Sequence, residues 1–325
     1  MTDPIRWGVL GAANFALQHM ARAIHAAEGA EFAALATSSA DKAAPFRAFQ
    51  PGLRVHDSYD ALLADPGIDA VYVPLPNHLH VEWTKKALEA GKHVLTEKPI
   101  ALAADQIDPL IALRDKTGLL ATEAYMIVHH PQWIRARQML RDGAIGDLVH
   151  VEGVFSYDNS DDPGNVRNDA SKGGGGIPDI GVYTYGSTRW MTGQEPQEIT
   201  LADITWEHGV DVIARVGARF DGFTAHFVNS MRMHPTQQMM FIGRKGRIVL
   251  DAPFNANIYG EARVVLVQED GAHRIERWPA ANHYVLQVEA FGRTIRDGVP
   301  FAWSLEDARG TQAMIDAVFA RAKAG

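Results

Sequence analysis

Residues 5–24 read IRWGVLGAANFALQHMARAI, and this stretch decides the fold of the amino-terminal part of the chain. The mostly apolar run Ile5–Leu10 predicts a buried strand. The segment Phe15–Ala27 carries apolar residues at helical spacing and predicts a helix. Gly11 stands between them, where a tight turn from strand to helix favours a residue without a side chain.

Short apolar runs and helical patterns keep alternating up to about residue 125. The further strands predicted there are Glu31–Thr37, Ala70–Val73, His93–Thr96 and Leu119–Thr122. Alternation with short connections is typical of a parallel sheet with helices on its faces. We therefore predict an α/β fold whose first domain, residues 1–125, is a Rossmann-type, doubly wound parallel sheet.

The pattern changes after residue 125, because strand-like runs follow one another with few helices between them. A loop-like segment, residues 156–176, ends in four glycines and precedes a helical run from about Pro178 to Met191. Two helices, His283–Arg296 and Leu305–Lys323, close the chain. We predict that residues 126–325 form an α+β domain with a large open, mostly antiparallel sheet.

Composition excludes several classes of function. The 325 residues carry 31 Lys and Arg against 39 Asp and Glu, a formal net charge of -8, without the basic run that nucleic acid or an anionic membrane attracts. The absence of Cys excludes disulfides, thiolate nucleophiles and iron–sulfur clusters. Residues 6–23 resemble a short signal peptide, but Asp3 and the interrupting glycines fit a strand and turn better. We expect a cytoplasmic protein.

The turn after the first strand is a candidate dinucleotide site. The segment Gly11-Ala12-Ala13-Asn14-Phe15-Ala16 stands where such sites carry G-x-G-x-x-G, although only the first glycine is present. The following helix offers backbone N–H groups to a phosphate. Residues Gly11 to Phe15 are therefore candidate cofactor contacts; a plain strand–helix turn is the alternative.

The end of the second predicted strand bears on the choice of cofactor. Thr37 and Ser38 stand where NAD-binding domains place an acidic residue, and Lys42 follows shortly after. Hydroxyl and ammonium groups can donate hydrogen bonds to a 2′-phosphate, which a carboxylate repels. The pattern favours NADP, with NAD left open, unless Ser38, Ser39 and Asp41 simply cap the next helix.

Three side chains could form a proton-transfer set. Lys98 directly follows a predicted buried strand, and carboxyl ends of parallel strands are where such sheets bind ligands. Asp179 and Tyr183 are four residues apart on a predicted helix and so project from one face. A nearby ammonium lowers the pKa of a phenol, which can then exchange a proton with an alcohol. Taken singly, each residue also fits a structural role.

Paired histidines raise the question of a metal. Neither His78 with His80 nor His129 with His130 has the spacing and companion carboxylates of a zinc site, so we predict no metal. His80 begins just past a strand end and is a candidate contact at the cofactor cleft.

Taken together, these features resemble the family of glucose–fructose oxidoreductase and inositol 2-dehydrogenase (Gfo/Idh/MocA) over nearly the whole chain. The ordered series that carries the resemblance is Gly11-Ala12-Ala13-Asn14, Leu75-Pro76-Asn77 with His80, Ala90-Gly91-Lys92-His93-Val94, Glu97-Lys98-Pro99, His130-Pro131-Gln132, Gly143-Ala144-Ile145-Gly146, Gly174-Gly175-Gly176 with Asp179-x-Gly181-x-Tyr183, and Gly193-Gln194-Glu195-Pro196. Within this family, the sequence is most similar to the subgroup of glucose–fructose oxidoreductase, xylose 1-dehydrogenase and trans-dihydrodiol dehydrogenase, because it has a tyrosine at position 183.

The resemblance implies roles for particular residues. Tyr183 would be the acid/base, Lys98 its partner and a ribose contact, and Asp179 a ligand of a substrate hydroxyl. Leu75, Asn77 and Glu97 would join the cofactor contacts. Arg167, in the stretch Gly164-Asn165-Val166-Arg167, is a candidate substrate contact, with a surface role equally open. The series departs from the family where Ala13 and Ala16 replace two glycines.

The implied activity is hydride transfer between NAD(P) and a carbinol carbon of a sugar, polyol or related compound. Two alternatives remain: an NAD-dependent glycosidase that oxidises its sugar transiently, and a non-catalytic regulator that senses a dinucleotide. The resemblance also implies a homodimer or homotetramer formed through the open sheet, with neither nucleic acid nor membrane as a partner.

Overall fold

The computed structural model describes residues 3–324, which form two compact units. The first unit comprises residues up to 101, 105–126 and 283–308, and the second comprises 102–104, 127–282 and the residues from 309 onward. Each unit is described by itself.

The first unit contains a six-stranded parallel sheet in the order β3-β2-β1-β4-β5-β6. Its strands are β1 (Ile5–Leu10), β2 (Ala30–Ala36), β3 (Arg54–His56), β4 (Ala70–Val73), β5 (His93–Thr96) and β6 (Ala121–Glu123). This order is that of the doubly wound dinucleotide-binding fold, so the predicted fold class of the first part is confirmed.

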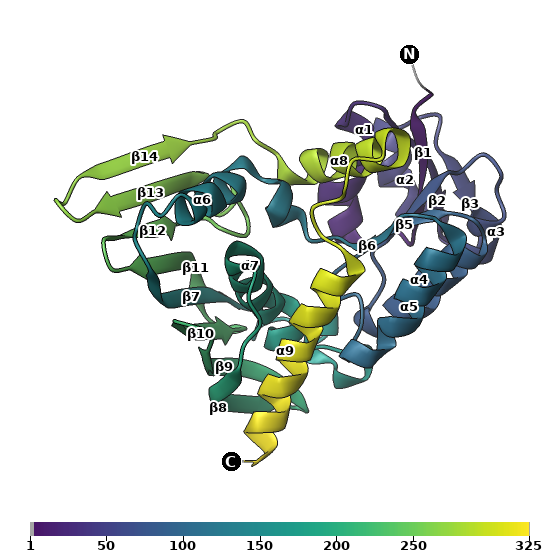
Figure 1. The fold of residues 1–325 in the computed structure, drawn as a ribbon. Helices are drawn as coiled ribbons and strands as arrows, with labels where there is room; N and C mark the ends of the chain where they lie inside the picture. Colours follow the sequence, from purple (N-terminus) through teal and green to yellow (C-terminus); the bar gives the residue numbers. More distant parts are fainter. Residues whose placement is uncertain (1–2, 325) are drawn as a thin grey trace. The chain divides into compact units, whose positions relative to one another are not determined.

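Helices pack on this sheet, among them the neighbours α4 and α5 (Figure 1). The longer helices of the unit are α1 (Ala21–Ala26), α2 (Ala40–Phe49), α3 (Tyr59–Leu63), α4 (His80–Glu89), α5 (Asp108–Thr117) and α8 (His283–Asp297). The helix predicted after β1 begins with a π-helical turn, η1 (Ala16–Met20); short 3₁₀ turns are η2 (Asn77–Leu79) and η3 (Ala104–Gln106), the latter at the boundary between the units.

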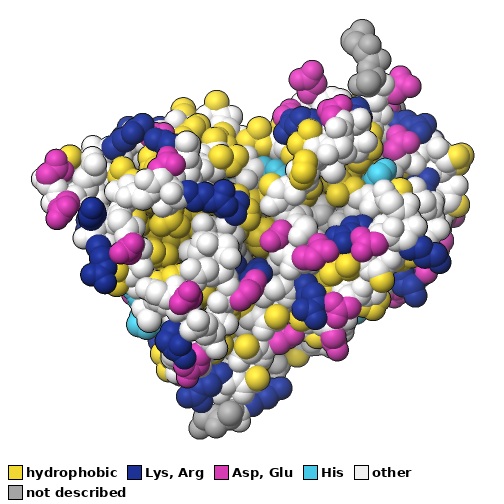
Figure 2. Space-filling model, in the orientation of Figure 1, with side chains coloured by type: hydrophobic (Ala, Val, Ile, Leu, Met, Phe, Trp, Pro, Cys, Tyr) yellow, Lys and Arg dark blue, Asp and Glu magenta, His cyan; other side chains and the backbone are white. Residues whose placement is uncertain are grey.

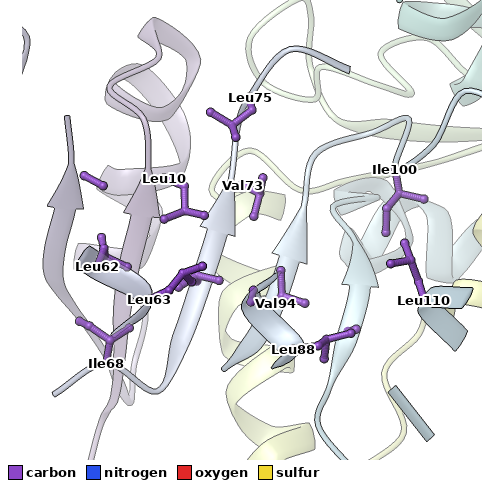
Figure 3. Packing of buried hydrophobic residues seen from close by; sticks show 14 of the residues in the cluster. Leu10, Leu62, Leu63, Ile68, Val73, Leu75, Leu88, Val94, Ile100 and Leu110 are labelled. Carbon is purple, nitrogen blue, oxygen red and sulfur yellow. The ribbon is translucent and has the colours of Figure 1, made fainter. Parts of the chain in front are cut away.

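Aliphatic side chains from strands and helices fill the core of the first unit, as Figure 3 shows. Leu62 and Leu63 of α3 pack against this cluster with Val73 of β4 and Val94 of β5. Burial of each such side chain stabilises the fold by about 1.5–3 kcal/mol. A tightly packed sheet of this kind is a rigid base for the loops that follow its strands.

Helix α8 belongs to the first unit, although the sequence placed its residues in the second domain. Phe291 of α8 packs on Trp7 of β1, with ring centroids 4.8 Å apart, and both side chains are fully buried. The reason lies in burial, because apolar side chains of α8 pack on β1 and β2 beside α1. Such a contact joins residues almost the whole chain apart.

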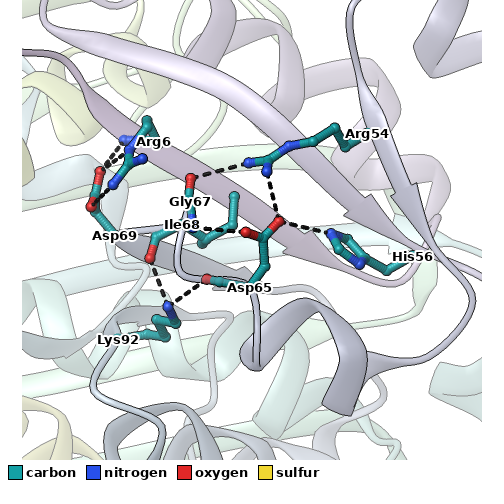
Figure 4. A network of polar contacts seen from close by, with 8 residues as sticks. All are labelled: Arg6, Arg54, His56, Asp65, Gly67, Ile68, Asp69 and Lys92. Atoms are coloured by element: carbon teal, nitrogen blue, oxygen red, sulfur yellow. Dashed lines mark hydrogen bonds and ion pairs between the residues drawn. The ribbon is translucent and has the colours of Figure 1, made fainter.

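A network of ion pairs and hydrogen bonds connects segments next to the amino-terminal ends of strands in the first unit (Figure 4). The Asp65 carboxylate contacts Arg54 at 2.9 Å and His56 at 3.1 Å and accepts the Gly67 N–H at 2.7 Å. The buried Lys92 ammonium donates to the carbonyls of Asp65 and Ile68, at 2.7 and 2.8 Å. These contacts fix the segment just before β4. It lies at the amino-terminal end of that strand, away from the carboxyl end.

The second unit contains an eight-stranded sheet in the order β14-β13-β12-β11-β7-β10-β9-β8. Its strands are β7 (Leu148–Asp158), β8 (Glu198–Glu207), β9 (Val210–Arg219), β10 (Thr224–Ser230), β11 (Arg232–Gly243), β12 (Gly246–Leu250), β13 (Arg263–Gln268) and β14 (His273–Arg277). Neighbours run antiparallel except β7 and β10, which are parallel. The prediction of a large, mostly antiparallel sheet is confirmed.

Helices α6 (Pro131–Arg141) and α7 (Val182–Thr192) pack on one face of this sheet (Figure 1). A π-helical turn, η7 (Ile177–Gly181), leads directly into α7, and α9 (Leu305–Ala324) ends the chain. The remaining short turns are η4 (Met126–His129), η5 (Val166–Asn168) and η6 (Ala170–Lys172).

The surface in view mixes acidic and basic side chains with apolar ones (Figure 2). Within the described part of the chain, every helix is too short or too polar to span a bilayer.

Candidate active site

The turn after β1 has the backbone geometry that the sequence predicted. Gly11 has φ +98°, and its N–H donates to the Ala36 carbonyl at 3.0 Å. A Cβ atom there would lie 3.1 Å from Leu75 Cδ2 and 3.2 Å from the Tyr59 hydroxyl. Gly11 thus lets β1, β2 and the loop after β4 come together. Residues 12–15, the candidate phosphate contacts, remain partly or fully exposed beside it.

At the end of β2, Ser39 and Ser38 have different environments. The Ser39 hydroxyl caps α2 by accepting the Lys42 N–H at 3.3 Å, and the Thr37 hydroxyl accepts the Ser39 N–H at 3.3 Å. The capping role considered for Ser39 is therefore confirmed. The side chains of Ser38 and Lys42 are exposed, so a role in binding a 2′-phosphate stays a prediction for them.

His80 is fully buried and supports two loops at this edge of the sheet. Its Nδ1 lies 2.7 Å from the Pro99 carbonyl and its Nε2 2.7 Å from the Leu75 carbonyl. Burial lowers its pKa to about 4, so near pH 7 the ring holds one N–H for these two acceptors. Neither ring nitrogen faces outward. These contacts show that His80 holds the two loops together, and a direct cofactor contact by His80 stays a prediction.

Lys98 lies two residues after the end of β5, in a turn whose Lys98–Pro99 peptide is cis. Glu97 shapes this turn, because its carboxylate accepts the Tyr72 hydroxyl at 2.5 Å and the Lys98 N–H at 3.3 Å. The Lys98 side chain is partly exposed. Asn77, also partly exposed, follows the neighbouring strand β4. The predicted cofactor contacts of the first unit thus gather at the carboxyl ends of its strands.

Glu123 completes this edge of the sheet, and sequence reasoning missed it. Its carboxylate accepts the Ile100 N–H and the Trp303 indole N–H, each at 2.9 Å. Burial raises its pKa to about 7, and the neighbouring Glu97 adds to this rise. Local sequence offers no signal for this role, which comes from strand register: Glu123 pairs with Thr96, the last residue of β5 before Glu97 and Lys98. The carboxylate therefore fixes the backbone just after the Lys98 turn.

In the second unit, Asp179 lies at the centre of a polar cluster. Tyr157, near the end of β7, donates its hydroxyl to Asp179 Oδ2 at 2.6 Å, and Arg167 Nε lies 2.8 Å from the same oxygen. The charge of Asp179 raises the pKa of Arg167, and burial together with Asp179 raises that of Tyr157. The structure thus brings together two predicted substrate residues, Asp179 and Arg167. Tyr157 was missed, although its position at the end of a strand beside the loop was a usable signal.

Tyr183 stands at the start of α7, four residues after Asp179 on the same continuous helical segment. Its ring packs among aromatic side chains, with centroids 5.8 Å from Phe155 and 5.5 Å from Phe254. The residue is 6% exposed, and its charged form would face Arg167. A phenol held in an apolar wall beside a carboxylate and a guanidinium can exchange a proton with a bound hydroxyl.

Asp211 of β9 anchors the start of this helical segment. Its carboxylate accepts the Ile177 N–H at 2.6 Å, and burial raises its pKa to about 7. Gly175 has φ +127°, and a Cβ atom there would lie 2.1 Å from Asp211 Oδ1. The glycine run therefore lets the backbone close around Asp211 just before Asp179. Lys98 belongs to the first unit and Tyr183 to the second, and their cooperation stays a prediction.

Comparison with known proteins identifies the family of the chain. The family model of oxidoreductases with an NAD-binding Rossmann fold (GFO/IDH/MocA) matches residues 5–125, and the model of the GFO/IDH/MocA C-terminal domain matches residues 133–249. A dTDP-3,4-didehydro-2,6-dideoxy-alpha-D-glucose 3-reductase from Actinomadura kijaniata is 33% identical over 320 residues, which cover 97% of this chain and 95% of that protein. D-xylose 1-dehydrogenase (NADP(+)) 2 from Haloferax volcanii is 30% identical over 98% of both chains.

A solved structure agrees with these matches. The crystal structure of KijD10, a 3-ketoreductase from Actinomadura kijaniata in complex with NADP and TDP-benzene, superposes with a TM-score of 0.89. The two chains are 32% identical, and the match covers 98% of each. Sequence, fold and relatives together identify an enzyme, an NAD(P)-dependent oxidoreductase. The chain thus belongs to the GFO/IDH/MocA oxidoreductase family, with which its sequence shares the ordered motifs and its structure both domains.

Proposed function

We propose that this enzyme transfers a hydride between NADP and a carbinol carbon of a sugar, polyol or related compound. The observation that carries the proposal is the cluster of Asp179, Arg167 and Tyr157, whose central residue Asp179 lies four residues before Tyr183 on one helical segment. A carboxylate and a guanidinium match the hydroxyl groups of a sugar, whose buried polar atoms each need a partner. A phenol beside them matches the proton transfer that accompanies alcohol oxidation.

The proposed cofactor is NADP, with NAD as the alternative. The KijD10 structure contains NADP, and the relative from Haloferax volcanii is named for NADP(+). In this chain, the exposed Ser38 and Lys42 offer donors where a 2′-phosphate would lie. Residues 11–15 would hold the pyrophosphate, and Leu75, Asn77, Glu97 and Lys98 would surround the nicotinamide half. When bound, the dinucleotide supplies or accepts the hydride.

The chain's own residues would handle the proton and orient the substrate. Tyr183 would take the proton from the reacting hydroxyl, or return it in the reverse direction. The Lys98 ammonium, if placed beside this phenol, would lower its pKa. Asp179 would accept a hydrogen bond from a neighbouring hydroxyl, and Arg167 would hold the Asp179 carboxylate in place. We also propose a homodimer or homotetramer.

A spectrophotometric screen tests the reaction class. Purified enzyme is mixed with aldoses, inositols and nucleotide-linked sugars, each with NADP and with NAD, and the reduced nicotinamide band is followed. We expect turnover with at least one sugar and a preference for NADP. Release of sugar from a chromogenic glycoside without net cofactor reduction would instead favour the glycosidase alternative. Dinucleotide binding without any turnover would favour the regulator.

The variant Tyr183→Phe tests the acid/base. We expect turnover to fall about 10²–10⁴-fold, because the proton acceptor is lost, while NADPH affinity stays unchanged. The matched control is Tyr185→Phe, two residues along the same helix, whose fully buried hydroxyl lacks a hydrogen-bond partner within the described residues. The control should keep wild-type turnover. Unchanged turnover in Tyr183→Phe would remove Tyr183 from the mechanism.

A further inference from the structure

Two neighbouring strands of the second unit place imidazole and carboxylate groups side by side. Strands β7 and β10 are parallel, and their register pairs His150 with Thr224 and Glu152 with His226. Side chains alternate along a strand, so His150 and Glu152 lie on one face of β7. Val151, between them, is fully buried on the other face. Tyr157 shares the parity of Val151, so the cluster lies on the opposite face of the sheet from Asp179.

The three donor groups are close enough to share one ion. Glu152 Oε1 lies 2.8 Å from His150 Nε2 and 3.7 Å from His226 Nδ1, and all three donor atoms lie within 4.8 Å of one another. Zinc ligands at bond lengths of about 2.0–2.2 Å in a tetrahedron lie roughly 3.4 Å apart. The Glu152 and His226 side chains are 46% and 60% exposed, so small rotations can reach this spacing.

The surroundings orient the rings as a metal site requires. His150 Nδ1 lies 2.7 Å from the Thr224 hydroxyl, which can accept its N–H and so leave the Nε2 lone pair facing Glu152. Metal-binding histidines are commonly fixed through their second nitrogen in this way. Gly217 of β9 pairs with His226, and a Cβ atom there would approach the His226 ring to 3.4 Å. The glycine thus gives the ring room.

The prediction of no metal rested on spacing along the chain, whereas His226 meets His150 and Glu152 across paired strands. We propose that His150, Glu152 and His226 bind a divalent transition-metal ion, with Zn²⁺ as the preferred occupant. Two imidazoles and one carboxylate suit zinc and its neighbours in the series, whereas Mg²⁺ and Ca²⁺ prefer oxygen ligands alone. Water would complete the coordination sphere. Within residues 3–324, these three residues are the one group of at least three His, Asp or Glu side chains whose ligand atoms all lie within 4.8 Å of one another. The site is separate from the proposed reaction centre and lies on the open face of the sheet, so an oligomer formed through that face would enclose it.

Calorimetric titration with Zn²⁺ tests the site on the full chain, freed of any histidine tag and of metal by a chelator. We expect about one ion per chain, and Co²⁺ should give the visible absorption of a tetrahedral complex. Changing either His226→Gln or His150→Gln should weaken binding at least tenfold. His273→Gln, on the exposed strand β14, is the matched control and should bind as wild type does.

Circular dichroism of each variant establishes that the fold is kept, which the exposure of these side chains leads us to expect. Glu152→Gln provides a third variant that preserves shape while removing charge, and it should also weaken binding. Two results would overturn the proposal. One is an absence of binding by the wild type in calorimetry. The other is equal affinity in wild type, His226→Gln and His150→Gln.

Discussion

At the scale of single residues, two buried carboxyl groups stand out. Glu123 and Asp211 belong to different units, yet each accepts backbone N–H groups beside a proposed functional residue. Burial raises the pKa of both to about 7. Each group therefore changes charge close to neutral pH. The backbone next to Lys98, and that leading to Asp179, is thus held by an acceptor whose strength depends on pH.

The pH dependence of stability tests the protonation of Glu123. The folded state keeps the proton up to about pH 7, whereas the unfolded chain releases it near its ordinary pKa of 4.5. Stability contributed by protonated Glu123 is therefore lost as pH rises from about 4.5 to 7, by about 3 kcal/mol at 1.4 kcal/mol per pKa unit. Urea unfolding of the first unit at pH 5 and pH 8 should show a smaller loss in Glu123→Gln than in wild type.

The control for this measurement is Glu28→Gln, an exposed carboxyl in the same unit. It should reproduce the wild-type difference between the two pH values. At pH 5, where wild-type Glu123 is protonated, Glu123→Gln should be less stable than wild type, because the amide nitrogen gives the Trp303 N–H no acceptor. Parallel pH profiles for wild type and Glu123→Gln would contradict the assignment.

At the scale of elements, the glycine loop (residues 173–176) and the helical segment η7–α7 that follows it together position the proposed functional side chains. Asp211 accepts the N–H of Ile177 at the start of that segment, and Asp179 and Tyr183 follow on it. A helix start held by a buried carboxylate has little freedom to shift. The loop backbone around Gly175 therefore determines where both functional side chains point.

The variant Gly175→Ala tests whether the glycine loop positions this helical segment. A Cβ atom 2.1 Å from Asp211 Oδ1 would displace the carboxylate, and φ +127° is unfavourable for alanine. We expect kcat/KM to fall at least tenfold, together with a lower melting temperature. Gly271→Ala controls for backbone strain alone, because Gly271 has φ +82° with open space around it. A variant Gly175→Ala as active as Gly271→Ala would show that the loop does not position the helix.

The elements also show where sequence patterns carry information. Strands β4 and β5 are buried on both faces, so their apolar runs were recognised with the correct bounds. The edge strands β3 and β14 were missed, because Arg54 and His56, or His273 and Arg274, read as loop residues. Most side chains of these two strands are exposed or only half-buried, so neither strand carries the hydrophobic pattern that a prediction needs.

At the scale of the whole molecule, a segment near the carboxyl terminus completes the core of the amino-terminal unit. Helix α8 contributes Phe291, which packs on Trp7 and also on Phe301, at a centroid distance of 5.9 Å. The first unit therefore cannot reach its final packing until residues 283–308 are available. A fragment that ends near residue 126 would expose this part of its sheet.

The variant Phe291→Ala measures this dependence. Removing a fully buried aromatic ring should destabilise the first unit by about 3–5 kcal/mol. Val299→Ala, an exposed position in the same segment, is the control and should change stability by less than about 0.5 kcal/mol. Urea unfolding followed by tryptophan fluorescence distinguishes the two. Equal midpoints for Phe291→Ala and wild type would show that α8 is dispensable to the core.

Long-range proximity is what the sequence could not supply. The approach of His150 to His226 across β7 and β10 depends on strand order and register. The pairing of Arg167 with Asp179 depends on how the loop between β7 and α7 folds back on itself. Glu123 reads as the polar end of a short strand until β6 is known to lie beside β5. Local spacing did predict Tyr183 and Asp179 on one helix, because that relation needs only the helical repeat.

The large sheet of the second unit ends in β14 on one side and β8 on the other. Both outer strands carry charges: Arg274, Glu276 and Arg277 on β14, and Glu198, Asp203 and Glu207 on β8. Adding a strand from another chain would bring these charges close together and remove their water. The charged outer strands therefore disfavour the strand-by-strand addition that builds cross-β fibres.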